Sequence, residues 1–142
     1  MLLSHYEVSQ YRNTYVIERY KKDFPDNTMA AEETFEELIK YLWLTQKHKE
    51  DQRNFPENEE LNFRCSMHSE MKEIDDMWHT FLLHTKQYML FCEKYFGGFI
   101  HHAPATLDDK FTADEFKTDF SRYLSYIWDN LGEEVITKWF GD

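Results

Sequence analysis

Apolar side chains recur at intervals of three and four residues through most of this 142-residue chain, and no segment alternates apolar and polar residues long enough to indicate a strand. Such spacing places apolar side chains on one face of an α-helix. The apolar content of 42% and the aromatic content of 18% can supply a core without disulfides or an obligatory metal. The sequence therefore predicts an all-α fold, a compact bundle of five or six helices in a single domain spanning residues 1–142.

Caps and breakers set the expected helix boundaries in the first half of the chain. One helix is predicted over residues 7–22, and a second, capped by Thr28, runs to about residue 47. Residues 49–60 are charged and lack a period, which predicts an exposed loop. A short extended piece is expected at residues 61–63.

The second half carries clearer boundary signals. A third helix is predicted from about Glu70, and a fourth from about Lys86 after a bend, ending at the Gly97–Gly98 pair. Thr112 and Glu115 form a capping box that starts a long helix, which Gly132 ends before a short last helix.

The net charge of −11 excludes several function classes. It repels phosphate backbones, so no nucleic-acid binding is expected. An acidic excess usually serves solubility, and it can also serve to bind a basic protein partner. No apolar run is long enough to span a membrane, and no signal peptide is apparent. Cys65 and Cys92 form no CxxC motif, so we expect reduced thiols in the cytoplasm, with a single disulfide as the alternative.

One stretch, residues 74–104, holds four of the seven histidines. On a helical wheel Asp75 and His79 are separated by one turn and share one edge of the apolar face, whereas His84 falls on the opposite edge. His79 and His84 are therefore not expected to bind one ion from a continuous helix.

The Asp75–His79 pair has two interpretations. It can be a structural hydrogen bond that orients His79 beneath the loop carrying His101 and His102. It can also be two-thirds of a metal site, with His101 or His102 as the third ligand, a set suited to non-haem Fe(II) or catalytic zinc. Cys65, His68 and Cys92 suggest a separate structural zinc site, which would require residues far apart in sequence to converge.

The central stretch also resembles the glycine-rich-domain-protein-like family, whose bacterial members are short and largely uncharacterised. The resemblance is dense over about thirty residues and weak before them, and no glycine-rich tail is present. It rests on these residues: Asp75, Trp78, His79, Phe81, Leu83, Thr85, Tyr88, Phe91, Cys92, Phe96, Gly97, Phe99, His101, His102 and Pro104. Asp76 stands where the bacterial form commonly has Glu. The resemblance implies no reaction, and it favours Asp75, His79 and His102 as the polar residues of the pattern.

Two functions are consistent with these observations. The first is a non-catalytic protein-interaction or regulatory module in which the Asp/Trp/His motif is structural. The alternative is a metal-dependent enzyme with Asp75, His79 and His102 as ligands and with His101 or Cys92 beside them. No P-loop, dinucleotide-binding glycine motif or nucleophile elbow occurs.

Overall fold

A computed structural model describes residues 2–102 and 112–141, and these contain seven α-helices, two short 3₁₀ helices and no strand. The prediction of an all-α fold is confirmed. The predicted number of five or six helices is too low by at least one, and the shortest helix, the first, has only four residues. The elements are α1 (His5–Val8), α2 (Thr14–Asp23), α3 (Ala31–Asn54), η1 (Glu59–Leu61), η2 (Ser69–Met71), α4 (Lys72–Leu83), α5 (Thr85–Phe96), α6 (Ala113–Leu131) and α7 (Glu133–Phe140).

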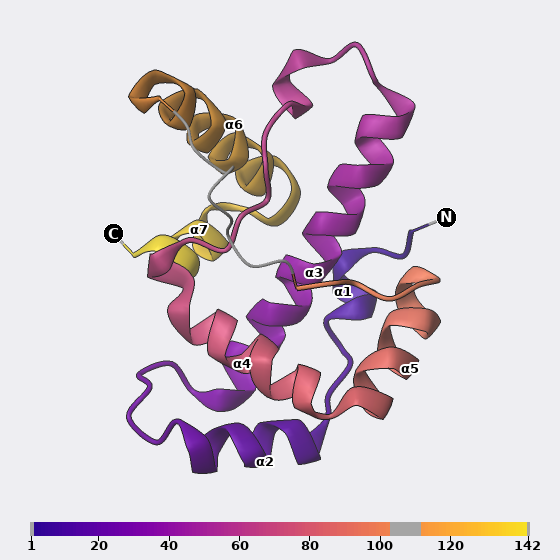
Figure 1. Ribbon diagram of the computed structural model, residues 1–142, viewed down its shortest axis with the longest axis vertical. Helices are drawn as coiled ribbons and strands as arrows, with labels where there is room; N and C mark the ends of the chain where they lie inside the picture. Colours follow the sequence, from indigo (N-terminus) through magenta and orange to yellow (C-terminus); the bar gives the residue numbers. More distant parts are fainter. Residues whose placement is uncertain (1, 103–111, 142) are drawn as a thin grey trace.

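Helix α3 is the longest element, and α1, α2, α4 and α6 all pack against it (Figure 1). Its buried face extends over four turns and forms the centre of the core, with Phe35, Leu38, Ile39, Leu42 and Leu44 fully buried. Helix α4, which carries the central sequence motif, lies against this face and connects directly to α5.

The single N-terminal helix predicted over residues 7–22 is wrong, because the chain breaks between α1 and α2. The Arg12 guanidinium donates to the carbonyls of Ser9 and Tyr11, and the Asn13 side chain accepts from the Val16 N–H to start α2. The break directs the Tyr11 ring into a cluster of aromatic side chains, namely Phe35, Phe81, Phe91 and Tyr95. Aromatic burial therefore outweighs the continuous helical period.

Helix α3 begins and ends later than predicted. Thr28 does not cap it; the Thr28 N–H and hydroxyl instead donate to Glu73 on α4. At the other end the helix continues to Asn54, so the loop predicted for residues 49–60 is helical in its first half. Asp51 in this segment is paired across the fold, because the Tyr126 hydroxyl on α6 donates to its carboxylate over 2.6 Å.

Residues 61–68, here called the strap, cross between α3 and α6. Leu61, the first residue of the expected extended piece, is instead the last residue of η1, and His48 on α3 contacts its carbonyl over 2.8 Å. Tyr41 donates to the Cys65 carbonyl over 2.7 Å, and Asp119 on α6 accepts from the Arg64 N–H. Side chains from both helices thus hold the strap in place.

The predicted boundaries of the second half are confirmed. His84 separates α4 from α5, and Gly97 ends α5 in the left-handed conformation, with φ of 75°. The capping box of Thr112 and Glu115 starts α6, and Gly132 separates it from α7. In the described ranges no helix combines the length and the apolar character needed to cross a membrane.

Candidate metal site

Two polar side chains project from the same edge of α4, one turn apart. Asp75 and His79 flank a buried stripe that includes Ile74 and Trp78, and this stripe fixes the rotation of the helix against α3. Side chains at positions i and i+4 lie above one another on a helix surface. The packing of α4 therefore brings the Asp75 carboxylate and the His79 ring to the same point.

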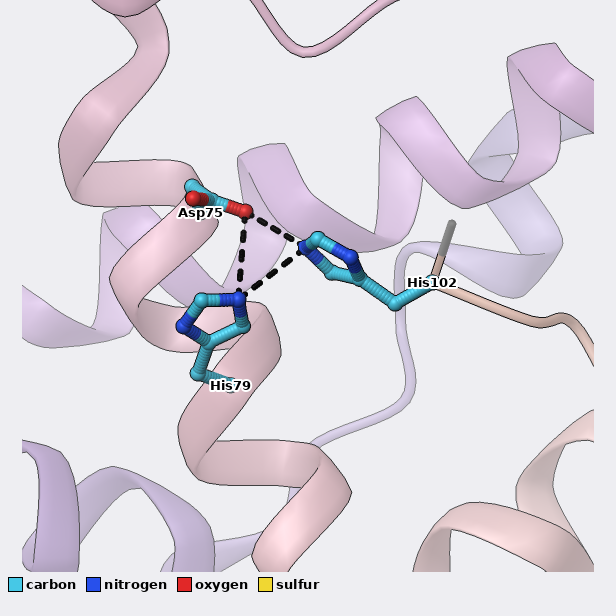
Figure 2. A group of neighbouring side chains, drawn as sticks. All are labelled: Asp75, His79 and His102. Atoms are coloured by element: carbon cyan, nitrogen blue, oxygen red, sulfur yellow. Dashed lines mark hydrogen bonds and ion pairs between the residues drawn. The ribbon is translucent and has the colours of Figure 1, made fainter. Parts of the chain in front are cut away.

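The third side chain comes from the segment that follows α5. Gly97 has the positive φ that allows the chain to reverse after the helix, and residues 99–102 return toward α4. Figure 2 shows that His102 points from this segment at Asp75 and His79. Segments more than twenty residues apart in sequence thus meet in one group.

Three atoms of this group face one another. His102 Nε2 lies 2.7 Å from Asp75 Oδ1 and 3.1 Å from His79 Nε2, and His79 Nε2 lies 3.7 Å from Asp75 Oδ1. Ligands at 2.1 Å from an ion are separated by about 3.0 Å at right angles and about 3.4 Å at tetrahedral angles. These distances define a triangle whose centre is about 1.9 Å from each atom, so an ion would lie just off its plane.

Hydrogen bonds alone satisfy this arrangement poorly. Each Nε2 carries either a proton or a lone pair. If His102 Nε2–H donates to Asp75 Oδ1, the lone pair on His79 Nε2 can only share that same proton. If His79 Nε2–H instead donates to His102 Nε2, the accepting lone pair of His102 lies beside the Asp75 carboxylate, which offers no proton. A cation at the centre would receive lone pairs from all three atoms, with both rings neutral and protonated at Nδ1.

The group is open to solvent on one side. The exposed fraction of the side chain is 55% for His79, 30% for Asp75 and 19% for His102. A purely structural lock would be expected to be buried, because an exposed hydrogen bond contributes little to stability. The exposure instead resembles a site that keeps coordination positions for water or another ligand.

The buried side of the group is built from aromatic residues. The Trp78 ring packs against the His102 ring at 4.2 Å between centroids. The Trp78 indole N–H donates to the Tyr88 hydroxyl over 3.0 Å, and that hydroxyl donates to the Ile100 carbonyl over 2.6 Å. Sequence reasoning assigned Trp78 and Tyr88 to the core; their presence in the family pattern beside Asp75 and His79 was the available signal for this second role.

The phenol of Tyr41, which lies next to this group, stays neutral. Burial raises the pKa of Tyr41, which packs against Trp78, and the Asp75 carboxylate contributes to the rise. Tyr41 therefore acts as a hydrogen-bond donor, and the negative charge at this point of the surface belongs to Asp75 itself.

Several residues considered from the sequence lie elsewhere. His101 is exposed and its ring contacts Phe99, so it is not part of the group. His84 contacts the Thr80 carbonyl through Nδ1, as its position on the opposite edge predicts. Asp76 accepts from Lys72 and from Asn27, which fixes the loop before α3.

The cysteines do not form the alternative zinc site. Cys65 lies in the strap, whereas Cys92 is buried in α5 beside Tyr88, and both thiols are free, so the disulfide alternative is not realised. In the described part of the chain, Asp75, His79 and His102 are the one group whose ligand atoms could hold a metal ion. The Cys92 thiol interacts with the backbone of Ile100, two residues before His102.

Comparison with protein-family models gives a match over most of the chain. A family model described as UCP032817-like matches residues 4–123, a span that includes all three side chains and the aromatic residues behind them. No curated protein and no solved structure matches the chain.

Proposed function

We propose that this chain, which belongs to the UCP032817-like family, binds one divalent transition-metal ion through Asp75, His79 and His102. The observation that carries the proposal is the convergence of Asp75 Oδ1 and two imidazole Nε2 atoms within 3.7 Å of one another. Two nitrogen ligands favour zinc or iron over magnesium or calcium, which prefer oxygen.

The number of ligands indicates how the ion would act. Structural zinc usually has four protein ligands, whereas catalytic zinc keeps three and an open position. With three ligands and the exposed His79 edge, an ion here would retain at least one position for water. Such an ion can lower the pKa of bound water or polarise a carbonyl, so the proposal extends to a metal-dependent enzyme of hydrolytic or hydrating type.

Zinc is the first ion to test and Fe(II) the second. A two-histidine, one-carboxylate set is also the ligand set of non-haem Fe(II) oxygenases. Reactive iron–oxygen chemistry benefits from a site closed to water. The 55% exposure of the His79 side chain therefore favours an ion without redox chemistry.

The narrower assignment to the glycine-rich-domain-protein-like family is part of this proposal. It is supported by the roles that the shared residues take: Asp75, His79 and His102 form the group, Trp78 and Tyr88 support it, and Gly97 turns the chain. These residues of the sequence pattern therefore lie together around one site in the fold.

A second candidate function, binding of a basic protein, is favoured by the net charge of −11. Such binding would weaken steeply as salt is raised and would not depend on His79. A partner captured equally by the wild type and by His79→Ala, and released by salt, would support this function independently of the metal site.

The decisive experiment is elemental analysis of the untagged protein after reconstitution with zinc and gel filtration. We expect about one equivalent of zinc in the wild type and none in His79→Ala. His101→Ala is the matched control, because it removes the neighbouring imidazole that lies outside the group, and it should retain the ion. A wild type without stoichiometric zinc or iron, or equal loss in His101→Ala, would overturn the proposal.

A further inference from the structure

We infer that Tyr88 is a positioning residue for the ligand His102, and that its hydroxyl holds the His102 segment in the ligating arrangement before any ion binds. The inference rests on the proposed function. It concerns a side chain that touches none of the three ligand atoms and acts through the backbone two residues before His102.

The Tyr88 hydroxyl is held between two hydrogen-bond partners. Tyr88 is fully buried on α5, and its hydroxyl accepts from Trp78 and donates to the Ile100 carbonyl over 2.6 Å. Burial raises the pKa of Tyr88, so the phenol stays protonated and the donated hydrogen bond persists across the neutral range.

Two side chains, Tyr88 and Cys92, reach the Ile100 backbone. Its carbonyl accepts from Tyr88, its backbone interacts with the Cys92 thiol, and the residue is only 6% exposed. These contacts fix the path of the backbone at Ile100, in the segment that follows α5. His102, two residues further on, has little freedom left in its backbone.

The hydrogen bonds from Trp78 through Tyr88 to Ile100, here called the relay, also reach the helix that bears the other two ligands. Trp78, which donates to Tyr88, lies on α4 between Asp75 and His79 in sequence and packs its ring on His102. The relay from Trp78 through Tyr88 to Ile100 therefore couples the helix bearing two ligands to the segment bearing the third. Side chains that orient ligands in this way typically contribute ten- to hundredfold to metal affinity.

The test compares zinc affinity and metal-free stability in Tyr88→Phe. The substitution keeps the ring and removes the hydroxyl, so we expect about a tenfold rise in the zinc dissociation constant, with the stoichiometry unchanged. Bound Co(II) should in addition show altered visible absorption bands, because the His102 ring takes a different direction. Melting of the metal-free protein measures the purely structural cost.

Tyr126→Phe is the matched control, because it also removes a buried phenolic hydrogen bond, the one to Asp51, but far from the ligands in sequence. It should lower the melting temperature and leave the zinc affinity unchanged. If Tyr88→Phe does not fold, Cys92→Ala tests the same anchor from the other side of Ile100 and should also weaken zinc binding.

The outcomes separate the two proposals. A wild type that binds no zinc overturns the proposed function. A wild type that binds zinc while Tyr88→Phe binds within twofold of it, or while Tyr126→Phe loses as much affinity, overturns only the positioning role. Weakened binding confined to Tyr88→Phe and Cys92→Ala would support it.

Discussion

Two regions of this molecule place histidines against aromatic rings, with opposite results. In the proposed metal corner, defined as Asp75, His79 and His102, two Nε2 atoms and a carboxylate oxygen converge at an exposed edge. Around the strap, His48 and His68 are each enclosed separately among aromatic rings. His48 contacts the Leu61 carbonyl, while His68 Nε2 is buried with no hydrogen-bond partner among the described residues.

The difference gives a criterion that separates the histidines of the proposed metal site from histidines that only pack against the core. His102 and both strap histidines contact tryptophan, tyrosine or phenylalanine rings, so proximity to aromatic rings does not separate the two kinds. What separates them is where the Nε2 atom points. In the metal corner it faces other potential ligand atoms, whereas around the strap it faces a backbone carbonyl in His48 and the core in His68. The following predictions test this distinction, beginning with the largest expected effect.

Zinc should stabilise the protein through the metal corner alone. With free zinc at about a thousand times its dissociation constant, the free energy of unfolding should rise by about 4 kcal/mol. Thermal melting with and without zinc should show this increase in the wild type and in His48→Ala, but not in His102→Ala. An equal increase in His102→Ala would mean that zinc binds elsewhere.

Removing a packing histidine should cost stability without affecting zinc. His48→Ala deletes a buried ring that stacks on Phe63 and contacts Leu61, so we expect a loss of about 2–3 kcal/mol in unfolding free energy. Urea denaturation in the presence of a chelator measures it. His48→Gln, which can still donate to the carbonyl, should recover part of the loss; no recovery would indicate that the ring packing is the whole contribution.

Acidification should lower the stability of the folded protein through the two histidines at the strap, His48 and His68. Burial lowers the pKa of His48 and of His68, so in the folded protein both remain neutral at a pH where the unfolded chain, with a pKa near 6.5, is already protonated. Because the unfolded state then binds more protons, stability falls as the pH drops below about 6.5. Urea midpoints of the metal-free protein at pH 7.5 and 5.5 should differ less in His68→Phe than in the wild type, and equal differences would contradict this.

The smallest effect is expected for a ligand histidine in the metal-free protein. The His79 side chain is 55% exposed, so His79→Ala should change the unfolding free energy by no more than about 0.5 kcal/mol when a chelator is present. A loss of about 1–3 kcal/mol would instead identify the group as a structural hydrogen-bond lock. The measurement therefore separates the two interpretations of the Asp75–His79 pair.

Much of the fold follows from local chemistry. The capping box at Thr112, the turn at Gly97 and the bend at His84 each specify a boundary within a few residues, and the structure has all three. The break before α2 could not be predicted, because it depends on Tyr11 reaching aromatic partners from α3, α4 and α5. Tertiary packing there overrides a good helical period.

The site was accessible to sequence reasoning in part. The helical wheel places Asp75 and His79 together, because that depends only on one regular helix. It cannot choose between His101 and His102, because neighbouring side chains in an irregular segment point in different directions. That choice depends on how Tyr88 and Cys92 hold Ile100, which is a property of the folded chain.

The turn at Gly97 has a consequence for how the sequence can vary. A side chain added at Gly97 or at Gly98 would meet no atom within 4 Å, so neither position is limited by space. Only Gly97 has a positive φ, which disfavours every residue with a Cβ and β-branched ones most. In a saturation library scored for zinc retention, Gly98 should accept nearly any residue, while Gly97 should accept asparagine or aspartate before valine or isoleucine. One backbone angle, at a residue that touches none of the ligands, would then decide which residues position 97 accepts.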